Sequence, residues 1–96
     1  MNVVFQAEAE AEYLAAVAYY GDRSSELQVR YRVAVEQALR RAGEQPRMYS
    51  AIGGGARRCV LAEFPYVIVF RIKGDAVLVV AVTHGKRKPG YWRGRR

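Results

Sequence analysis

The chain has very few of the residues that build disulfide frameworks or metal sites. Its 96 residues include one cysteine, Cys59, and one histidine, His84. A single cysteine excludes an internal disulfide and is typical of a reducing compartment. One cysteine and one histidine are also too few for almost any protein zinc site. We therefore expect no bound metal and no other cofactor.

Long apolar segments are missing as well. The longest apolar run, Ala76 to Val82, is far shorter than the roughly 18–20 residues that span a bilayer. The N-terminus reaches three glutamates by Glu12 and lacks the basic and then apolar start of a signal peptide. These absences predict a cytoplasmic protein that does not cross a membrane.

Acidic residues are scarce in the second part of the chain. Residues 1–56 contain six basic and seven acidic side chains, a net charge of −1, whereas residues 57–96 contain ten basic and two acidic side chains, a net charge of +8. This asymmetry indicates an anionic partner for the second part, or a tail that only supports solubility. We favour a partner, because the last six cations are interleaved with Pro89, Gly90, Tyr91 and Trp92. These cations are Lys86, Arg87, Lys88, Arg93, Arg95 and Arg96.

Hydrophobic periodicity predicts an α+β fold of one domain, residues 1–96, with the element order β-α-α-β-β-β. A helical hairpin should pack on a small, mostly antiparallel sheet. Residues 1–43 comprise a strand and the hairpin, residues 57–83 a three-stranded meander, and residues 84–96 a basic aromatic tail.

The hairpin has recognisable ends. A strand at residues 2–5 precedes a helix that begins near Glu8, ends at Gly21-Asp22 and places Tyr13 and Tyr20 on one face. Ser24 or Ser25 should cap the second helix, residues 25–43, which Gly43 and Pro46 close. Val29 and Val33 lie on its opposite side. They are tolerated surface residues or part of a partner-binding stripe.

Three β-rich runs follow, at residues 57–63, 66–72 and 76–83. Phe64-Pro65 and Lys73-Gly74-Asp75 separate them and are short enough for hairpins. Residues 66–72 alternate between two unlike faces, and residues 77–82 are apolar throughout, as in a central strand.

Two small motifs favour structural roles. Gly53-Gly54-Gly55 lacks the Lys-Ser or Lys-Thr pair and the following helix of a phosphate-binding loop, so we expect a flexible connection. Cys59 lies on a predicted strand with no base nearby in sequence, so we expect a core or half-buried thiol.

The basic residues and His84 also permit a metal-free nuclease. Cleavage of RNA by its 2′-hydroxyl needs a base, a cation for the phosphorane and an acid. His84 or Tyr91, with Arg58, Arg71 and Arg87, supplies these roles if the side chains converge; otherwise His84 is a hydrogen-bonded structural residue. Likewise, Tyr91 and Trp92 either pack the tail or contact a partner.

Several motifs together resemble the ParE/RelE superfamily of type II toxins, and most closely its ParE branch. They are Phe5-x-x-x-Ala9-Glu10-x-Glu12, Tyr19-Tyr20, Arg57-Arg58 before Phe64-Pro65-Tyr66-Val67-Ile68-Val69-Phe70, and the ending Val82-x-His84-x-Lys86-Arg87-x-Pro89-Gly90-Tyr91-Trp92-x-x-Arg95. The resemblance implies a growth-inhibiting toxin that a cognate antitoxin wraps and silences in a hetero-oligomer.

The resemblance implies one of two targets. ParE-like members are associated with poisoning DNA gyrase, whereas the RelE branch cleaves mRNA on the ribosome. For the nuclease alternative, a metal-independent endoribonuclease, the catalytic set is Arg58, His84, Arg87 and Tyr91. Residues 48–56 lack the lysine that this alternative requires, and Pro89-Gly90-Tyr91-Trp92 looks more like the ParE type. A plain nucleic-acid-binding module is a third possibility.

We therefore expect two binding surfaces. The predicted target-binding residues belong to the tail: Arg87, Lys88, Tyr91, Trp92, Arg93 and Arg95. The predicted antitoxin-binding residues are Val29, Val33, Arg58 and Arg71, with the antitoxin covering the helical hairpin and a sheet edge.

Overall fold

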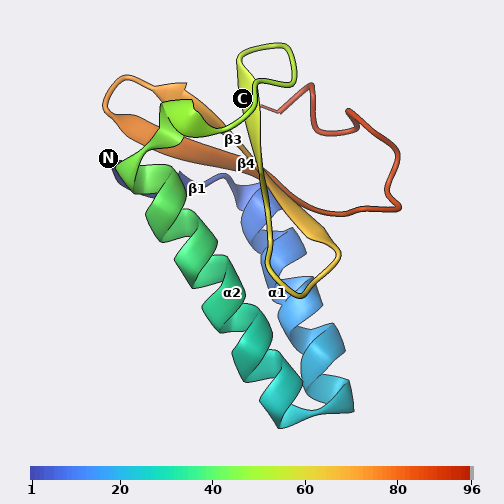
Figure 1. Ribbon diagram of the computed structural model, residues 1–96. Coiled ribbons are helices and arrows are strands. Elements are labelled where there is room, and N and C mark those ends of the chain that lie inside the picture. The colour runs from blue at the N-terminus through green and yellow to red at the C-terminus, as the bar shows by residue number, and fades with distance from the viewer. Residues whose placement is uncertain (96) are drawn as a thin grey trace.

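The computed structural model describes residues 1–95 and has the predicted α+β element order. Arg96, the last residue of the predicted tail, lies outside the described residues. Figure 1 shows two long helices that extend from one layer of strands. The elements are β1 (Asn2–Phe5), α1 (Ala7–Arg23), α2 (Ser25–Glu44), the short 3₁₀ turn η1 (Pro46–Met48), β2 (Ala56–Val60), β3 (Tyr66–Lys73) and β4 (Ala76–His84).

The four strands form one sheet in the order β1-β4-β3-β2. Strands β2, β3 and β4 are an antiparallel meander, whereas β1 pairs parallel to β4, with Asn2 opposite Ala76 and Phe5 opposite Val79. The sheet is therefore mostly antiparallel, as predicted. Strand β4 is central, in agreement with its uninterrupted apolar sequence.

The hairpin packs on the sheet through an aromatic core. Tyr31 of α2 is fully buried, and its ring lies 5.8 Å from Tyr13, 5.2 Å from Tyr20 and 5.5 Å from Phe64 between centroids. Alanines on the inner faces of both helices allow this close approach, because Ala9, Ala16 and Ala38 are almost completely buried. The residues predicted to form the inner face of α1 are therefore in the core or against it.

The predicted end of α1 at Gly21-Asp22 is wrong, because the helix continues to Arg23. Gly21 lies inside the helix, beside the flexible end of the Gln28 side chain. A Cβ at this position would lie 2.2 Å from Nε2 of Gln28, whose amide donates to the carbonyl oxygen of Val17 at 3.1 Å. A side chain at position 21 would therefore displace the Gln28 amide from this hydrogen bond.

The predicted end of α2 needs a smaller correction. Gly43 is buried inside the last turn, and the helix ends at Glu44. A Cβ on Gly43 would meet Val3 Cγ2 at 2.9 Å, so this glycine permits contact between α2 and β1. The N-terminal amine of Met1 donates to the Gly43 carbonyl at 2.7 Å and so satisfies one of the free carbonyls at the helix end.

Strand β2 is shorter than the predicted residues 57–63 and ends at Val60. The cause is local, since Glu63 has a φ of 67°, the left-handed conformation that does not continue a strand. Leu61 and Phe64 are nevertheless buried, so the turn contributes to the core. The apolar content extended the prediction beyond the true end of the strand.

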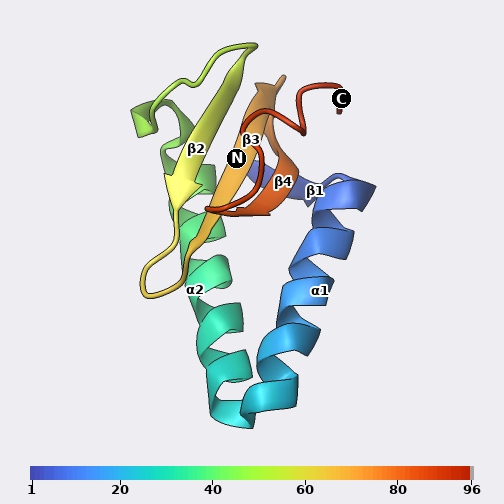
Figure 2. The ribbon, with the colours of Figure 1, turned by 90° about the vertical axis from the view of Figure 1, so that its right-hand side faces the viewer.

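The two faces of β3 pack against different parts of the protein. Ile68 and Phe70 face the helices, while Val67 and Val69 belong to a second cluster on the opposite, outer face. Val80 has no partner in the register of β3 and β4, and both Val80 and Ala81 are buried in this outer cluster. In Figure 2 the C-terminal tail, in red, crosses in front of the sheet while α2 lies behind it.

Candidate functional site

Glu12 occupies the edge of β4 at the point where β1 has ended. β1 pairs with β4 only as far as Val79, and Glu12 of α1 then accepts the backbone N–H of Val82 at 2.9 Å through Oε1. Its position on the helix, between the buried residues Ala9 and Ala16, turns it toward the sheet. The Glu12 carboxylate therefore accepts a backbone hydrogen bond at an edge of β4 where β1 no longer pairs.

The same carboxylate holds the tail. Arg95 donates through Nη1 to Oε1 at 3.0 Å and through Nη2 to Oε2 at 3.1 Å, and the Tyr91 hydroxyl donates to Oε2 at 2.7 Å. Arg95 Nη1 also donates to the carbonyl of Val80 at 3.0 Å. This bidentate pairing of arginine with carboxylate is the strongest geometry for such a contact.

The electrostatics of Glu12 favour its ionised form. Burial by itself would raise the pKa of the Glu12 carboxyl, but the hydrogen bonds from Arg95, Tyr91 and the Val82 N–H, together with the Arg95 charge, lower it below the ordinary 4.5. The carboxylate is thus charged over the whole neutral range and available to four donors.

Residues 85–95, which we call the strap, lie across the outer face of the sheet. Trp92 is only 5% exposed and packs in the outer cluster with Ala56, Val69, Val80 and Ala81. The strap therefore has two attachments, an apolar one through Trp92 and a charged one through Glu12. The packing interpretation of Trp92 fits this placement, and its predicted contact with a target stays a prediction.

Tyr91 lies between two guanidinium groups. Arg87 lies over its ring at 4.0 Å and Arg95 at 5.0 Å from the centroid. Burial raises the pKa of the Tyr91 hydroxyl above its ordinary value. The nearby Thr83 hydroxyl and the Arg87 charge lower this pKa, the hydrogen bond to Glu12 and the Glu12 charge raise it, and the net shift is upward. The proton of Tyr91 is therefore firmly held at neutral pH.

A shallow pocket of about 260 Å³ lies between the strap and the outer face of the sheet. Its floor includes the apolar residues Ile52, Val67, Val69 and Trp92. Basic side chains from β2 and from the strap line its rim, and no acidic residue lines it. The rim cations are Arg58, Arg87, Lys88 and Arg93.

Three of the four predicted nuclease residues, Arg58, His84 and Arg87, line this pocket, and Tyr91 does not. His84 Nδ1 accepts the backbone N–H of Lys86 at 3.1 Å, and the ring packs edge-on against Tyr66 at 5.2 Å. Neutral His84 would therefore have its proton on Nε2. These contacts fit the structural role for His84, in which it shapes the turn after β4.

The predicted antitoxin-binding residues divide between two faces of the molecule. Val29 and Val33 are 55% and 47% exposed on the outer side of α2. Arg58 and Arg71 lie on the sheet, where Arg71 Nη1 donates to the Gly54 carbonyl at 2.6 Å. That contact holds a turn in which Gly53, Gly54 and Gly55 all have positive φ. One partner could cover all four residues only by wrapping around the protein.

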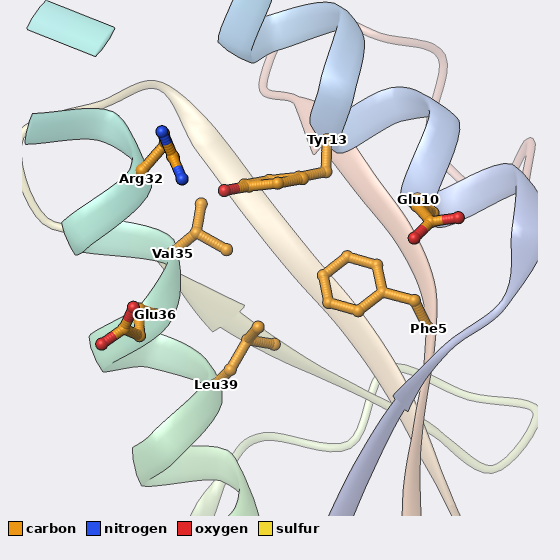
Figure 3. A pocket seen from close by; sticks show the side chains of 7 residues that line it. All are labelled: Phe5, Glu10, Tyr13, Arg32, Val35, Glu36 and Leu39. Atoms are coloured by element: carbon orange, nitrogen blue, oxygen red, sulfur yellow. The ribbon is translucent and has the colours of Figure 1, made fainter. Parts of the chain in front are cut away.

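A second hollow, of about 240 Å³, lies between the two helices near the sheet (Figure 3). Apolar side chains from β1 and both helices form its walls, with Glu10, Arg32 and Glu36 at its rim. The apolar set is Phe5, Tyr13, Val35 and Leu39. Such a mixed groove suits an amphipathic segment.

Among residues 1–95, no three histidine, cysteine or carboxylate side chains are close enough together to hold a metal ion. No helix there is both long and apolar enough to cross a membrane. Cys59 is 2% exposed, which confirms the predicted core position of its thiol.

Sequence reasoning missed the role of Glu12, which entered only as one of three glutamates near the N-terminus and as part of a family motif. Its position in the sequence could have identified Glu12. It lies beside Tyr13 and four residues before the buried Ala16, at the border of the apolar stripe. Glu8 and Glu10 are both exposed to solvent. An acid at the border of a buried face needs a partner.

These observations define a small, basic α+β domain in which a helical hairpin covers one face of the sheet and a cationic strap covers the other. The model of the ParE toxin family, described as the ParE toxin of the type II toxin–antitoxin system parDE, matches residues 3–89. The chain therefore belongs to the ParE toxin family. This match confirms the resemblance inferred from the motifs.

Comparison with solved structures supports the fold. A chain of the chromosomal ParDE toxin–antitoxin system from P. aeruginosa superposes with a TM-score of 0.76 at 16% sequence identity, covering 88% of this chain and 95% of that chain. A comparison with curated proteins finds no match. The fold is thus shared with a ParDE system at low sequence identity.

Proposed function

We propose that this toxin inhibits growth by binding DNA gyrase through the basic surface of its strap. The proposal depends on one observation: the groups that could transfer protons already form hydrogen bonds within the protein. The Tyr91 hydroxyl donates to Glu12, and His84 Nδ1 accepts from Lys86, whereas Arg87 and Lys88 remain exposed. Such a surface is equipped to bind a partner rather than to cleave a substrate.

The test is a DNA supercoiling assay with purified protein and gyrase. We expect inhibition of supercoiling or gyrase-dependent DNA cleavage, and a weaker effect for Arg87→Ala. Arg23→Ala removes the same charge at the far end of the hairpin and should behave as wild type. If the wild-type protein produces neither effect, gyrase is not the target.

A cognate antitoxin is the second proposed partner. The groove between the helices offers apolar walls, and the exposed Val29 and Val33 lie on α2 beyond the charged Arg32 and Glu36 of the groove's rim. An amphipathic antitoxin segment that fills the groove should stabilise the folded toxin by mass action. Its saturating addition should raise the melting temperature, and an unchanged value contradicts this proposal.

One observation favours a second function, a ribosome-dependent mRNA endonuclease. Arg58, His84 and Arg87 line one pocket, as that chemistry requires. Primer extension on translated mRNA separates the two functions, because only a nuclease leaves cuts at the ribosomal A site. Arg87→Ala is the control, since it should abolish such cuts.

A further inference from the structure

The cations of the strap fall into two groups with different surroundings. Arg95 has 17% of its side chain exposed and is paired through both nitrogens with Glu12. Arg87 has 53% of its side chain exposed and lies 3.9 Å from Glu12 Oε2, at the limit of an ion pair. Lys88 and Arg93 are exposed to solvent. Arg95 is thus used inside the protein, while Arg87, Lys88 and Arg93, together with the exposed Lys86, remain available to a partner.

Glu12 is the group that joins the elements of this region. Its carboxylate contacts the Val82 N–H on β4 and both Tyr91 and Arg95 on the strap, while its own backbone belongs to α1. Only 14% of the Glu12 side chain is exposed. A group so enclosed and so fully paired defines the position of the strap more sharply than a surface ion pair would.

We propose that Glu12 is a positioning residue: by holding the strap closed, it fixes Arg87, Lys88 and Arg93 beside Arg58 as a preformed docking surface for an acidic protein segment. This inference rests on the proposed binding of a protein target and names the chemistry of the segment that docks. A strap free to move would present the same charges without fixed spacing and would lose part of its binding free energy to ordering.

The surroundings of the pocket favour an acidic peptide over single-stranded nucleic acid. Unpaired bases bind largely by stacking on aromatic rings. Here Trp92 is buried, and guanidinium groups lie 4.0 Å and 5.0 Å from the centroid of the Tyr91 ring. The other floor residues, Ile52, Val67 and Val69, are aliphatic and lie below a cationic rim. A segment with alternating acidic and apolar side chains matches both features.

The first measurement follows the strap itself through Trp92, the only tryptophan of the chain. Glu12→Gln keeps the size of the side chain and removes its charge, and Arg95→Ala removes the opposite partner. Both should shift the emission of Trp92 to longer wavelength and increase its quenching by iodide. Arg87→Ala and the exposed-site control Glu26→Gln should leave the emission unchanged.

The second measurement is binding of a synthetic peptide rich in glutamate and leucine, with an RNA oligonucleotide of the same net charge for comparison. If the strap of Glu12→Gln is closed one tenth of the time, the peptide should bind about tenfold more weakly than to wild type. Arg87→Ala should also weaken binding, although its strap stays closed.

A double-mutant cycle distinguishes positioning from a general loss of structure. If Glu12 acts through the placement of Arg87, Arg87→Ala should cost less affinity in the Glu12→Gln background than in wild type. Cooperative unfolding of each variant establishes that it folds. Should Glu12→Gln fail to fold, Arg95→Ala takes its place in the same cycle.

The outcomes separate this inference from the proposed target. The inference is overturned if Glu12→Gln leaves Trp92 buried, if an open strap binds the peptide as tightly as wild type, or if the effects in the cycle simply add. Tighter binding of the RNA overturns the acidic peptide as the partner. If the peptide results hold and gyrase is unaffected, the docking surface stands and only gyrase as the target is wrong.

Discussion

The carboxylate of Glu12 must stay ionised for the strap to keep its charged attachment, and this makes the stability of the protein dependent on pH. The groups that face Glu12 are Arg87, Tyr91 and Arg95 on the strap. Tyr19, Tyr66 and His84 line the adjoining hollow, and Glu8 precedes Glu12 on α1. Burial raises the pKa values of the Tyr66 and Tyr91 hydroxyls, so neither changes charge in the acidic range.

We predict that acid weakens the fold through Glu12. Its pKa in the folded protein is below the ordinary 4.5, so its contribution to stability is complete above pH 4.5. The contribution is lost as the pH falls through the lower pKa of the folded state. Urea unfolding between pH 7 and pH 3 should therefore show a steeper fall for wild type than for Glu12→Gln. Equal slopes would show that another carboxylate dominates.

The buried hydroxyl of Tyr31 contributes little to the stability of the fold. The residue is fully buried, its hydroxyl has no hydrogen-bond partner among residues 1–95, and burial strongly raises its pKa. A buried polar group without a partner costs free energy.

We predict that Tyr31→Phe keeps the free energy of unfolding or raises it by up to about 1 kcal/mol. Tyr31→Ala, which removes the aromatic ring that contacts Tyr13 and Phe64, should instead lower it by about 3–5 kcal/mol. Urea denaturation measures both values. A loss above about 1 kcal/mol in Tyr31→Phe would reveal a favourable role for the hydroxyl.

The burial of an individual residue was predictable where its local sequence is enough to decide it. The lack of a base near Cys59 in the sequence favoured a core or half-buried thiol over a reactive one, and the thiol is buried. Glu12 and Arg95 were not predictable as a pair, because 82 residues separate them in the sequence. Their contact depends on how the strap crosses the sheet, which periodicity does not encode.

Among the elements, the junction of α1 and α2 depends on one side chain. Ser24 has extended backbone angles, and its hydroxyl oxygen accepts the N–H of Leu27 at 3.2 Å, so it is the N-cap of α2. The sequence left Ser24 and Ser25 as alternatives, and Ser25 is the first residue of the helix.

We predict that Ser24→Ala lowers the free energy of unfolding by about 1 kcal/mol, because it leaves a helix N–H without its acceptor. Ser25→Ala, the matched control one residue away, should change it by less than about 0.5 kcal/mol. Thermal or urea unfolding resolves this difference. Equal effects would mean that the cap hydrogen bond contributes nothing measurable.

Helices and strands were predictable in type and order, and less so at their ends. Period-3.6 and period-2 patterns identified both helices and the meander because burial on one face determines them. The predicted ends of helices and strands were wrong where the backbone conformation departs from the local sequence preference. α1 continues through Gly21 as far as Arg23, and the left-handed Glu63 terminates the run after β2.

At the scale of the whole molecule, the net charge of +7 is concentrated after residue 56. The cations of the pocket rim and strap lie on one face of the sheet, and the hairpin lies on the other. Charges arranged in this way attract an acidic partner over a distance of about 10 Å at 0.1 M salt.

We predict that the association rate with an acidic partner falls at least about tenfold between low salt and 0.5 M NaCl, while the dissociation rate changes little. Stopped-flow kinetics provide both rates. Val33→Ala, which leaves the charge unchanged, should keep the same salt dependence. A dissociation rate that carries most of the salt effect would contradict steering by long-range charge.

The position of the first strand could not be predicted from the sequence. The runs at residues 66–72 and 76–83 lie next to each other, and a short turn implies their pairing. β1 instead pairs in parallel with β4, more than 70 residues away, and no local pattern specifies which strand it joins. The apolar run of β4 indicates only that it has neighbours on both sides.

This pairing of the first strand with the last also determines when a newly made chain can become a finished toxin. During synthesis β1 and the hairpin emerge early, but the sheet edge that β1 needs exists only after His84, and the guanidinium that Glu12 needs arrives with Arg95. Long-range pairings of this kind form late in folding. A ribosome that stalls before the strap is made would therefore release a fragment with neither a closed sheet nor its cationic face. Under the proposed function, in which the strap is the binding surface, the protein can become toxic only when translation is nearly complete.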